Sequence, residues 1–131
     1  HNRVRRQRQM CIRDSAATDG LRNVELELHA GSCVTVVLAS EGYPAAPVKG
    51  RPVVGLEKAL ATSTYGDCWV NIAGVAVSDE GQFIASGGRV LSCTAMGSDL
   101  AETQKTAYGL LSAIDLEGGH HRTDIAHRAM H

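Results

Sequence analysis

The sequence has 131 residues, of which 44% are hydrophobic and 21% charged, enough for one compact domain with a buried core. Its longest apolar runs, such as Val34–Ala39, are far too short to span a bilayer. Five arginines and one aspartate lie in residues 1–15, so the rest of the chain is mildly acidic and gives no support for nucleic-acid binding.

Residues 1–15, HNRVRRQRQMCIRDS, show no apolar periodicity. One interpretation is a basic tail that binds nucleic acid or an acidic surface. The part QRQMCIRDS, however, resembles a translated adapter or cloning sequence. We therefore expect residues 1–15 to be a non-native or disordered leader and residues 16–131 to form the domain. If the leader is foreign, the natural protein is expected to continue upstream.

The four cysteines form no CxxC pair and are Cys11, Cys33, Cys68 and Cys93. Three of them lie in apolar contexts that suit reduced, buried thiols. The basic start of the chain is not followed by the apolar segment of a signal peptide. A cytoplasmic protein is therefore expected.

The first predicted elements are two strands and a loop. Val24–Leu28 alternates strictly, as a half-buried strand does. Cys33–Ala39 is almost continuously apolar and rich in β-branched residues, which predicts a buried strand. Residues 40–56 hold all three prolines and predict a long ordered loop, a feature that is often functional. A short helical turn is expected over Leu56–Ala61.

The middle of the chain predicts a hairpin and a further strand. Cys68–Val77 is strand-like, Asp79-Glu80-Gly81 predicts a turn, and Gln82–Ala85 predicts the returning strand. After Gly87-Gly88, a strand is expected over Arg89–Ala95.

A helix is predicted to begin at Asp99, whose carboxylate can cap free backbone N–H groups, with Glu102 completing a pattern like a capping box. Its register is expected to end at Glu117-Gly118-Gly119, after an apolar stripe made of Leu100, Ala107, Leu111 and Ile114. The remaining tail predicts a short turn or helix. Together the elements predict an α+β fold: a single small domain with a mostly antiparallel sheet and one main helix.

The order of these segments resembles the C-terminal domain of glycinamide ribonucleotide synthetase, also called phosphoribosylamine–glycine ligase. The family pattern runs roughly VVLAS-x-GYP, KG, GL, HAGT, GGRVL-x-VTA-x-G and R-x-DI. The matching segments here are VTVVLASEGYP (34–44), Lys49-Gly50, Gly55-Leu56, SGGRVLSCTAMG (86–97) and EGGHHRTDIAHRA (117–129). The likeness covers residues from about 24 to 130. It departs from the pattern where HAGT corresponds to Ile72-Ala73-Gly74-Val75, because the polar His and Thr positions are apolar.

The resemblance implies an ATP-grasp ligase that joins 5-phosphoribosylamine and glycine to give glycinamide ribonucleotide, ADP and phosphate in de novo purine biosynthesis. In that family ATP and Mg²⁺ or Mn²⁺ are held by the ATP-grasp part, through a motif resembling RFGDPE. This motif and the N-terminal glycine-rich loop are absent from the sequence. The chain is therefore expected to be one domain, inactive alone and without a catalytic residue, ATP or metal of its own. Its expected partners are the N-terminal and ATP-grasp domains of the same protein.

An alternative of another class is a non-catalytic binding module for a phosphorylated small molecule, or an orphan fragment without independent function. In either case neither nucleic acid nor a membrane is expected as a partner.

Gly87-Gly88-Arg89 is the first candidate site, with two interpretations. It is either a tight turn that needs positive φ and leaves Arg89 exposed, or a loop where glycines admit an anion and the guanidinium neutralises it. The resemblance favours substrate binding by Gly87, Gly88 and Arg89, because related ATP-grasp purine enzymes hold the ribose phosphate with basic residues of this domain. Arg89 could instead help close the domain over the nucleotide.

Tyr43 and Pro44 are the second candidate, either as a structural turn with Tyr43 packed over the sheet or as a cleft wall or domain contact. The tail offers metal-ligand residue types at His120, His121, Asp124, His127 and His131. Zinc sites usually draw on converging separate elements. We therefore expect no metal site, and an ion pair or cap between Arg122 and Asp124. Cys93 is expected in the core rather than as a nucleophile.

Overall fold

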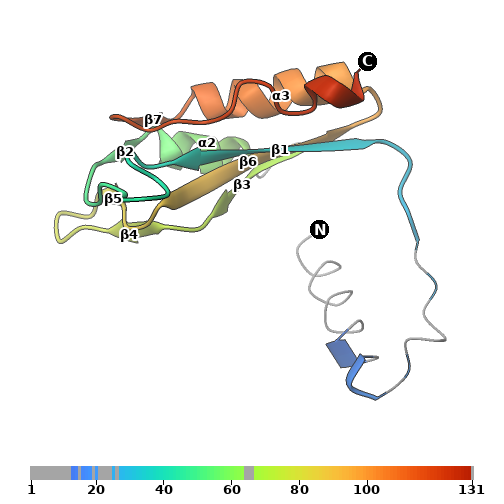
Figure 1. Ribbon diagram of the computed structural model, residues 1–131, viewed down its shortest axis with the longest axis horizontal. Coiled ribbons are helices and arrows are strands. Elements are labelled where there is room, and N and C mark those ends of the chain that lie inside the picture. Colours follow the sequence, from blue (N-terminus) through green and yellow to red (C-terminus); the bar gives the residue numbers. More distant parts are fainter. Residues whose placement is uncertain are drawn as a thin grey trace.

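The computed structural model describes residues 13, 14, 16–18, 20, 25, 27–63 and 67–130. Its centre is a three-stranded antiparallel sheet in the order β1 (Ser32–Ala39), β6 (Arg89–Gly97) and β3 (Cys68–Ile72) (Figure 1). Strand β6 lies in the middle and pairs with both neighbours. The predicted strands over 33–39 and 89–95 are therefore confirmed.

Two smaller pairs of strands complete the β structure. Strands β4 (Val75–Val77) and β5 (Phe83–Ala85) form the predicted hairpin, in which Gly81 adopts a φ of 81° that favours glycine. Strand β2 (Val53–Val54) pairs with β7 (Asp115–Leu116). Every strand pairing among the described residues is antiparallel, which confirms the predicted α+β fold.

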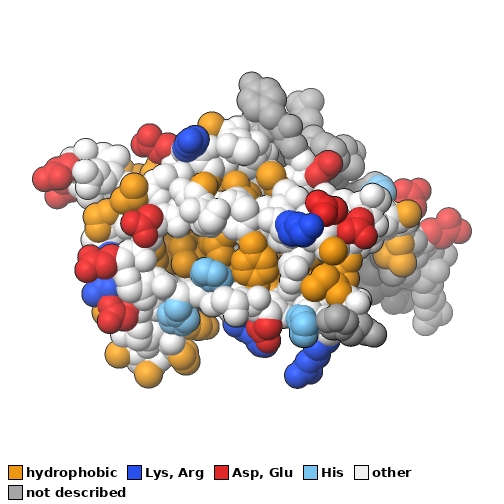
Figure 2. Space-filling view, turned by 90° about the horizontal axis from the view of Figure 1, so that it is seen from above, with side chains coloured by type: hydrophobic (Ala, Val, Ile, Leu, Met, Phe, Trp, Pro, Cys, Tyr) orange, Lys and Arg blue, Asp and Glu red, His pale blue; other side chains and the backbone are white. Residues whose placement is uncertain are grey.

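Two helices lie on the same side of the sheet (Figure 1). Helix α2 (Leu56–Thr62) confirms the predicted helical turn, and α3 (Leu100–Ser112) is the main helix. Asp99 caps α3 as predicted, because its Oδ1 accepts a hydrogen bond from the Glu102 N–H at 2.9 Å. Seen from the α3 side, charged side chains and histidines are interspersed with apolar ones (Figure 2).

Helix α3 ends at Ser112, earlier than the predicted end at residues 117–119. Ile114 continues the apolar stripe and is only 8% exposed, but it follows the helix and precedes β7. The apolar pattern therefore predicted correctly that Ile114 is buried, but it was wrong in placing Ile114 within the helix. The tail ends in a short 3₁₀ helix, η2 (His127–Ala129), which confirms the predicted final turn or helix.

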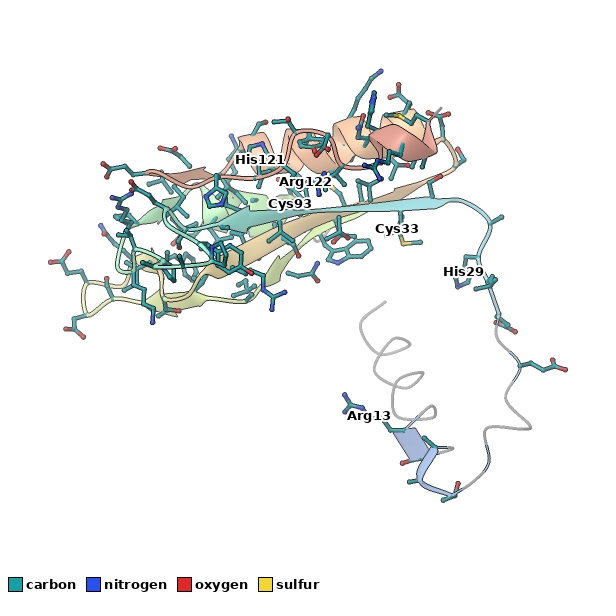
Figure 3. All side chains as sticks on the ribbon, viewed as in Figure 1. Arg13, His29, Cys33, Cys93, His121 and Arg122 are labelled. Carbon is teal, nitrogen blue, oxygen red and sulfur yellow. The ribbon has the colours of Figure 1, made fainter. Side chains whose placement is uncertain are left out.

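The central sheet has one covered and one uncovered face, because successive side chains of a strand point to opposite sides. We call the side toward α3 the closed face; its buried members are Val34, Val36, Leu38, Leu91, Cys93 and Ala95. We call the other side the open face; its members are Cys33, Thr35, Val37, Trp69, Asn71, Ser92, Thr94 and Met96. Figure 3 shows Cys33 pointing away from α3.

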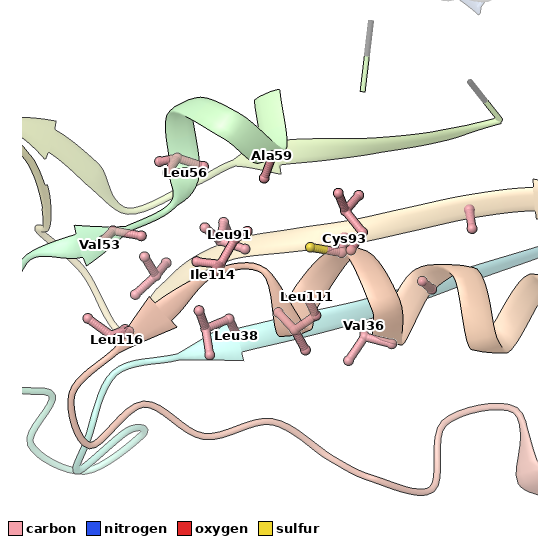
Figure 4. Packing of buried hydrophobic residues seen from close by; sticks show 14 of the residues in the cluster. Val36, Leu38, Val53, Leu56, Ala59, Leu91, Cys93, Leu111, Ile114 and Leu116 are labelled. Carbon is pink, nitrogen blue, oxygen red and sulfur yellow. The ribbon is translucent and has the colours of Figure 1, made fainter. Parts of the chain in front are cut away.

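The hydrophobic core lies between the closed face and the two helices (Figure 4). Val36 and Cys93 on the sheet have no exposed surface, and Leu111 of α3 is 3% exposed. Leu56 and Ala59 extend this core from α2. Burying such side chains stabilises the fold by roughly 1.5–3 kcal/mol for each large aliphatic residue.

Two expectations about the strands are wrong. Of the strand predicted over 24–28, Glu25, Glu27 and Leu28 lie in no strand, while Val24 and Leu26 lie outside the described residues. Leu28 is 90% exposed, so no core holds it. The strand predicted over 68–77 is interrupted at Ala73-Gly74, because both backbone N–H groups donate to the Val90 carbonyl, at 3.0 and 2.9 Å. This is the hydrogen-bond arrangement of a bulge.

The thiols are less uniform than expected. Cys93 is buried, Cys68 is half-buried and Cys33 is exposed, and all three are free. Cys33 is exposed because it belongs to the open face. Cys11 lies outside the described residues, as does the predicted leader apart from Arg13 and Asp14. Within the described ranges, no helix combines the length and apolar character needed to cross a bilayer.

Candidate functional site

The Gly87-Gly88-Arg89 segment connects β5 to β6. Neither glycine lies in the left-handed region of backbone space, so the prediction that this turn needs positive φ is wrong. Glycine is required at position 88 because there is no room for a side chain. A Cβ added at Gly88 would lie 2.4 Å from Tyr43 Cδ2, closer than real Cβ contacts allow. The Tyr43 ring therefore packs directly on Gly88, which brings together two segments that were predicted as separate candidates.

Ser40 anchors the two glycines to the end of β1. Its Oγ donates to the Gly87 carbonyl at 2.8 Å, and its backbone N–H donates to the Gly88 carbonyl at 2.8 Å. The side chain is 1% exposed, so this hydrogen bond is shielded from water. Sequence analysis missed Ser40. The available signal was a hydroxyl directly after the apolar run of β1.

The loop that carries Tyr43 and Pro44 is tied to the rest of the domain. The Arg51 guanidinium pairs with the Glu41 carboxylate and donates to the Glu117 carbonyl, the latter at 2.7 Å. The Gly50 N–H donates to the Ala85 carbonyl at 2.7 Å. The Tyr43–Pro44 peptide bond is cis. Tyr43 thus stands on an anchored loop and is 38% exposed.

Ala73-Gly74 forms the third side of the site. A Cβ added at Gly74 would lie 2.7 Å from the Arg89 carbonyl oxygen and 2.9 Å from Gly87 Cα, so only glycine fits. The Gly74 carbonyl also accepts the Ser86 N–H at 2.8 Å. The two neighbours at which the chain departs from the family pattern, Ile72 and Val75, do not line the site.

The three segments surround an open surface hollow of about 690 Å³. Its lining residues are Val37, Tyr43, Pro44, Pro47, Ala73, Gly74, Gly88, Arg89, Leu91 and Ser92. Gly87 is absent from this lining and acts as support behind it. Sequence analysis also missed Val37 and Ser92, which reach the hollow from the open face.

Of the described residues that line the hollow, Arg89 alone carries a charged side chain. It is exposed, and within the part of the chain that the structure describes its guanidinium has no hydrogen-bond or ion-pair partner. A guanidinium presents several N–H donors in a planar fork that suits phosphate and carboxylate groups. The hollow is therefore chemically suited to an anionic ligand.

The tail holds an ion pair of its own and is joined to α3 by a tyrosine. Arg122 donates to both carboxylate oxygens of Asp124, at 2.8 and 2.7 Å, which confirms the predicted ion pair. These hydrogen bonds hold the pKa of the Asp124 carboxyl below its ordinary value. Tyr108 Oη donates to the Arg122 carbonyl at 2.7 Å and accepts the Ile125 N–H at 3.1 Å. His121 and Arg122 lie beside α3 in Figure 3.

The described residues contain no group of three or more His, Cys, Asp or Glu side chains placed to hold a metal ion. His131, the last of the predicted candidates, lies outside them. Cys93 lies in the core, as expected, and burial raises the pKa of its thiol to about 12, with a smaller contribution from Cys68. A thiol of that pKa remains protonated at neutral pH and is a poor nucleophile.

Comparisons with known proteins give a consistent result. Residues 33–128 match a family model described as "Phosphoribosylglycinamide synthetase, C domain". The phosphoribosylamine–glycine ligase of Caulobacter vibrioides is 46% identical over 100 residues, which cover 76% of this chain and 22% of that protein. The ligase of the same name from Leifsonia xyli subsp. xyli is 46% identical over 106 residues, covering 79% of this chain and 24% of the relative.

A solved structure agrees with these relatives. The crystal structure of phosphoribosylamine–glycine ligase from Thermotoga maritima superposes with a TM-score of 0.64 at 36% identity, over 84% of this chain and 26% of that one. The chain thus spans about a quarter of the length of the relatives it matches. The family match includes β1 from Cys33 onward, the Tyr43 loop, the hollow, α2 and α3.

Proposed function

The chain belongs to the family of phosphoribosylglycinamide synthetase C domains, and from this premise we propose that it is the C-terminal domain of an ATP-dependent phosphoribosylamine–glycine ligase. The whole enzyme joins 5-phosphoribosylamine and glycine to form glycinamide ribonucleotide, ADP and phosphate in de novo purine biosynthesis. The observation that carries the proposal is the family match over residues 33–128, with 46% identity to relatives that bear the ligase name.

In this proposal the hollow receives the ribose phosphate of the substrate. Arg89 neutralises the phosphate and donates hydrogen bonds to its oxygens, while Tyr43 and Pro44 form a wall. The support is the Arg89 guanidinium, which no described residue pairs, together with the absence of a carboxylate among the described lining residues. A hydrogen bond between charged groups is worth about 1.5–3 kcal/mol, which corresponds to roughly 10- to 100-fold in affinity.

ATP and Mg²⁺ or Mn²⁺ belong to the rest of the enzyme in this proposal. The described residues do not fit a metal, because no cluster of carboxylate, imidazole or thiol ligands is present among them. This domain therefore contributes substrate contacts and no ligase activity of its own. We also propose the cytoplasm as its compartment, which agrees with the free thiols of Cys33, Cys68 and Cys93.

The test is a chimera in which residues 33–131 replace the matching C-terminal part of the Leifsonia xyli ligase. We expect the chimera to form glycinamide ribonucleotide in the presence of ATP and the isolated 131-residue chain to form none. In the chimera, Arg89→Ala should raise the KM for phosphoribosylamine by roughly 10- to 100-fold and leave the KM for glycine unchanged. Lys58→Ala, which removes an exposed cation on α2, serves as the matched control.

Two outcomes contradict the proposal. Unchanged KM and kcat in the folded Arg89→Ala chimera would remove Arg89 from the substrate site. A folded but inactive chimera, together with binding of ribose 5-phosphate by the isolated chain, would favour a stand-alone module for a phosphorylated small molecule.

A further inference from the structure

The open face has an unusual composition for a surface that water reaches. None of its side chains is charged, although charged side chains are spread over the α3 side in Figure 2. Val37 and Met96 of this face are 41% and 39% exposed. Depletion of charge, with Trp and Met present, distinguishes the centre of a protein interface from ordinary surface.

The polar groups of the open face already bond to one another across the three strands. The hydroxyls of Thr35 and Thr94 are 2.9 Å apart, and Asn71 Nδ2 donates to Thr94 Oγ1 at 2.9 Å. Trp69 Nε1 in turn donates to Asn71 Oδ1 at 3.1 Å. Polar groups that already have partners lose little when water is removed. A second surface can therefore cover this face at low cost.

The hollow and the open face are continuous. Val37 and Ser92 face each other across β1 and β6 on the open face, and both also line the hollow. Whatever covers the open face therefore lies beside the hollow and can provide its missing wall. A second copy of the chain bound to the open face would cover the hollow and block the entry of substrate.

We infer that the open face is the surface by which this domain docks against the remainder of the ligase. The inference rests on the proposed function, and it adds the location and chemistry of the contact. The relatives are about four times longer than the matched segment, so a large part of the same polypeptide is available as the occupant. The docked surface must itself be apolar or uncharged, because a charge opposite this face would lose water without gaining a partner. Nucleic acid is not the occupant, because its phosphates would need lysine or arginine side chains on this face.

The experiment compares the accessibility of an introduced thiol in the free 131-residue chain and in the full-length chimera with the Leifsonia xyli ligase. Val37→Cys places a probe on the open face, and Val77→Cys places a matched probe on another exposed strand valine, in β4. Iodoacetamide alkylation of each introduced thiol is followed by peptide mass spectrometry. We expect the rate for Val37→Cys to fall about tenfold in the chimera relative to the free chain, and the rate for Val77→Cys to stay unchanged.

Equal Val37→Cys rates in the two proteins overturn the inference. Protection that is already present in the free chain and increases with its concentration also overturns it, because the occupant is then a second copy. Turnover is measured on the chimera without an introduced cysteine, because Val37 lines the hollow, and it reports separately on the proposed function. An active chimera with a reactive Val37→Cys thiol refutes only the docking surface, whereas an inactive chimera with a protected thiol refutes the ligase assignment and retains the surface.

Discussion

The two faces of the central sheet are made by alternate residues of the same three strands, yet they have opposite surroundings. Val36 on the closed face has no exposed surface, while its neighbour Val37 on the open face is 41% exposed. The residue type is the same, so hydrophobicity alone does not decide burial. Burial is decided by the period of two along the strand and by the presence of α3 on one side only.

The two faces also differ in their content of polar side chains. The buried members of the closed face are aliphatic apart from the Cys93 thiol, whereas the open face carries bonded hydroxyl and amide groups. A buried face excludes polar groups because each would need a partner. The open face accommodates them by pairing them within itself. The side chains of the open face are thus exposed in this chain, yet their polar groups already have the partners that burial would require.

The strongest way to break this comparison is one substitution made at two neighbouring positions. Val36→Asp places a carboxylate in the core without a partner, so we expect loss of cooperative unfolding, an effect above about 4 kcal/mol. Val37→Asp on the open face should change the free energy of unfolding of the isolated chain by less than about 1 kcal/mol. Guanidinium titrations followed by circular dichroism measure both. Equal destabilisation would show that the two faces are not distinct.

The thiols sharpen the same contrast through pH. Burial raises the pKa of Cys93 from 9.0 to about 12 in the folded chain. Its contribution to stability is therefore complete below pH 9 and is lost as the pH rises toward 12, by about 1.4 kcal/mol per pH unit. Cys93→Ala should abolish this part of the alkaline slope, measured by unfolding titrations between these pH values. Cys33→Ala is the control on the open face, and a slope that it removes instead would contradict the assignment.

Ser40→Ala tests the boundary between the sheet and the hollow. The variant leaves the Gly87 carbonyl without its donor at a site shielded from water, which should cost about 1–3 kcal/mol of stability. In the chimera we also expect a higher KM for phosphoribosylamine, because the segment that leads to Arg89 loses one of its two hydrogen bonds to Ser40. Thermal unfolding and steady-state kinetics measure the two effects. Ser112→Ala, at an exposed hydroxyl on α3, should change neither.

The smallest expected effect concerns the tail that lies over α3. The pKa of Asp124 is lowered by Arg122, so its contribution is present above the ordinary aspartate pKa and is lost as the pH falls through the lower folded value. The protection of the Ile125 amide against hydrogen exchange should fall as the pH drops through the lowered pKa of Asp124, because this amide donates to Tyr108 Oη beside the ion pair. Asp124→Asn should remove this pH dependence while leaving global unfolding unchanged. Asp115→Asn, on β7, provides the comparison.

Features that depend on adjacent residues could be predicted from the sequence. Asp99 with Glu102 predicted the start of α3, because a cap needs only the first turn of the helix. Asp79-Glu80-Gly81 predicted the β4–β5 hairpin for the same local reason. The strand β1 was also predicted, but the exposure of its alternate residues was not. That exposure depends on which face another element covers, and no local pattern records it.

Features that depend on distant contacts were missed or misplaced. The break after β3 lies where Ala73 and Gly74 both donate to the Val90 carbonyl, a contact that the apolar pattern of residues 68–77 does not contain. The same holds for the candidate site. Its two segments were predicted separately, and they meet because Ser40 bonds to Gly87 and Tyr43 packs on Gly88. Whether the hollow binds substrate stays a prediction that the Arg89→Ala chimera decides.

The contact of Gly74 with Gly87, described above as a steric necessity, has a consequence for how this site can change. Main chain approaches main chain at this contact, so a side chain cannot be introduced at Gly74 without moving the backbone of Gly87 and Arg89. Variation is open at lining residues with larger side chains, among which Arg89 carries the charge and Tyr43 and Pro47 stand on the loop. Attempts to redirect ligand preference should therefore exchange these residues and leave Gly74 unchanged. Any side chain introduced at Gly88 would displace Tyr43 and alter the whole opening at once.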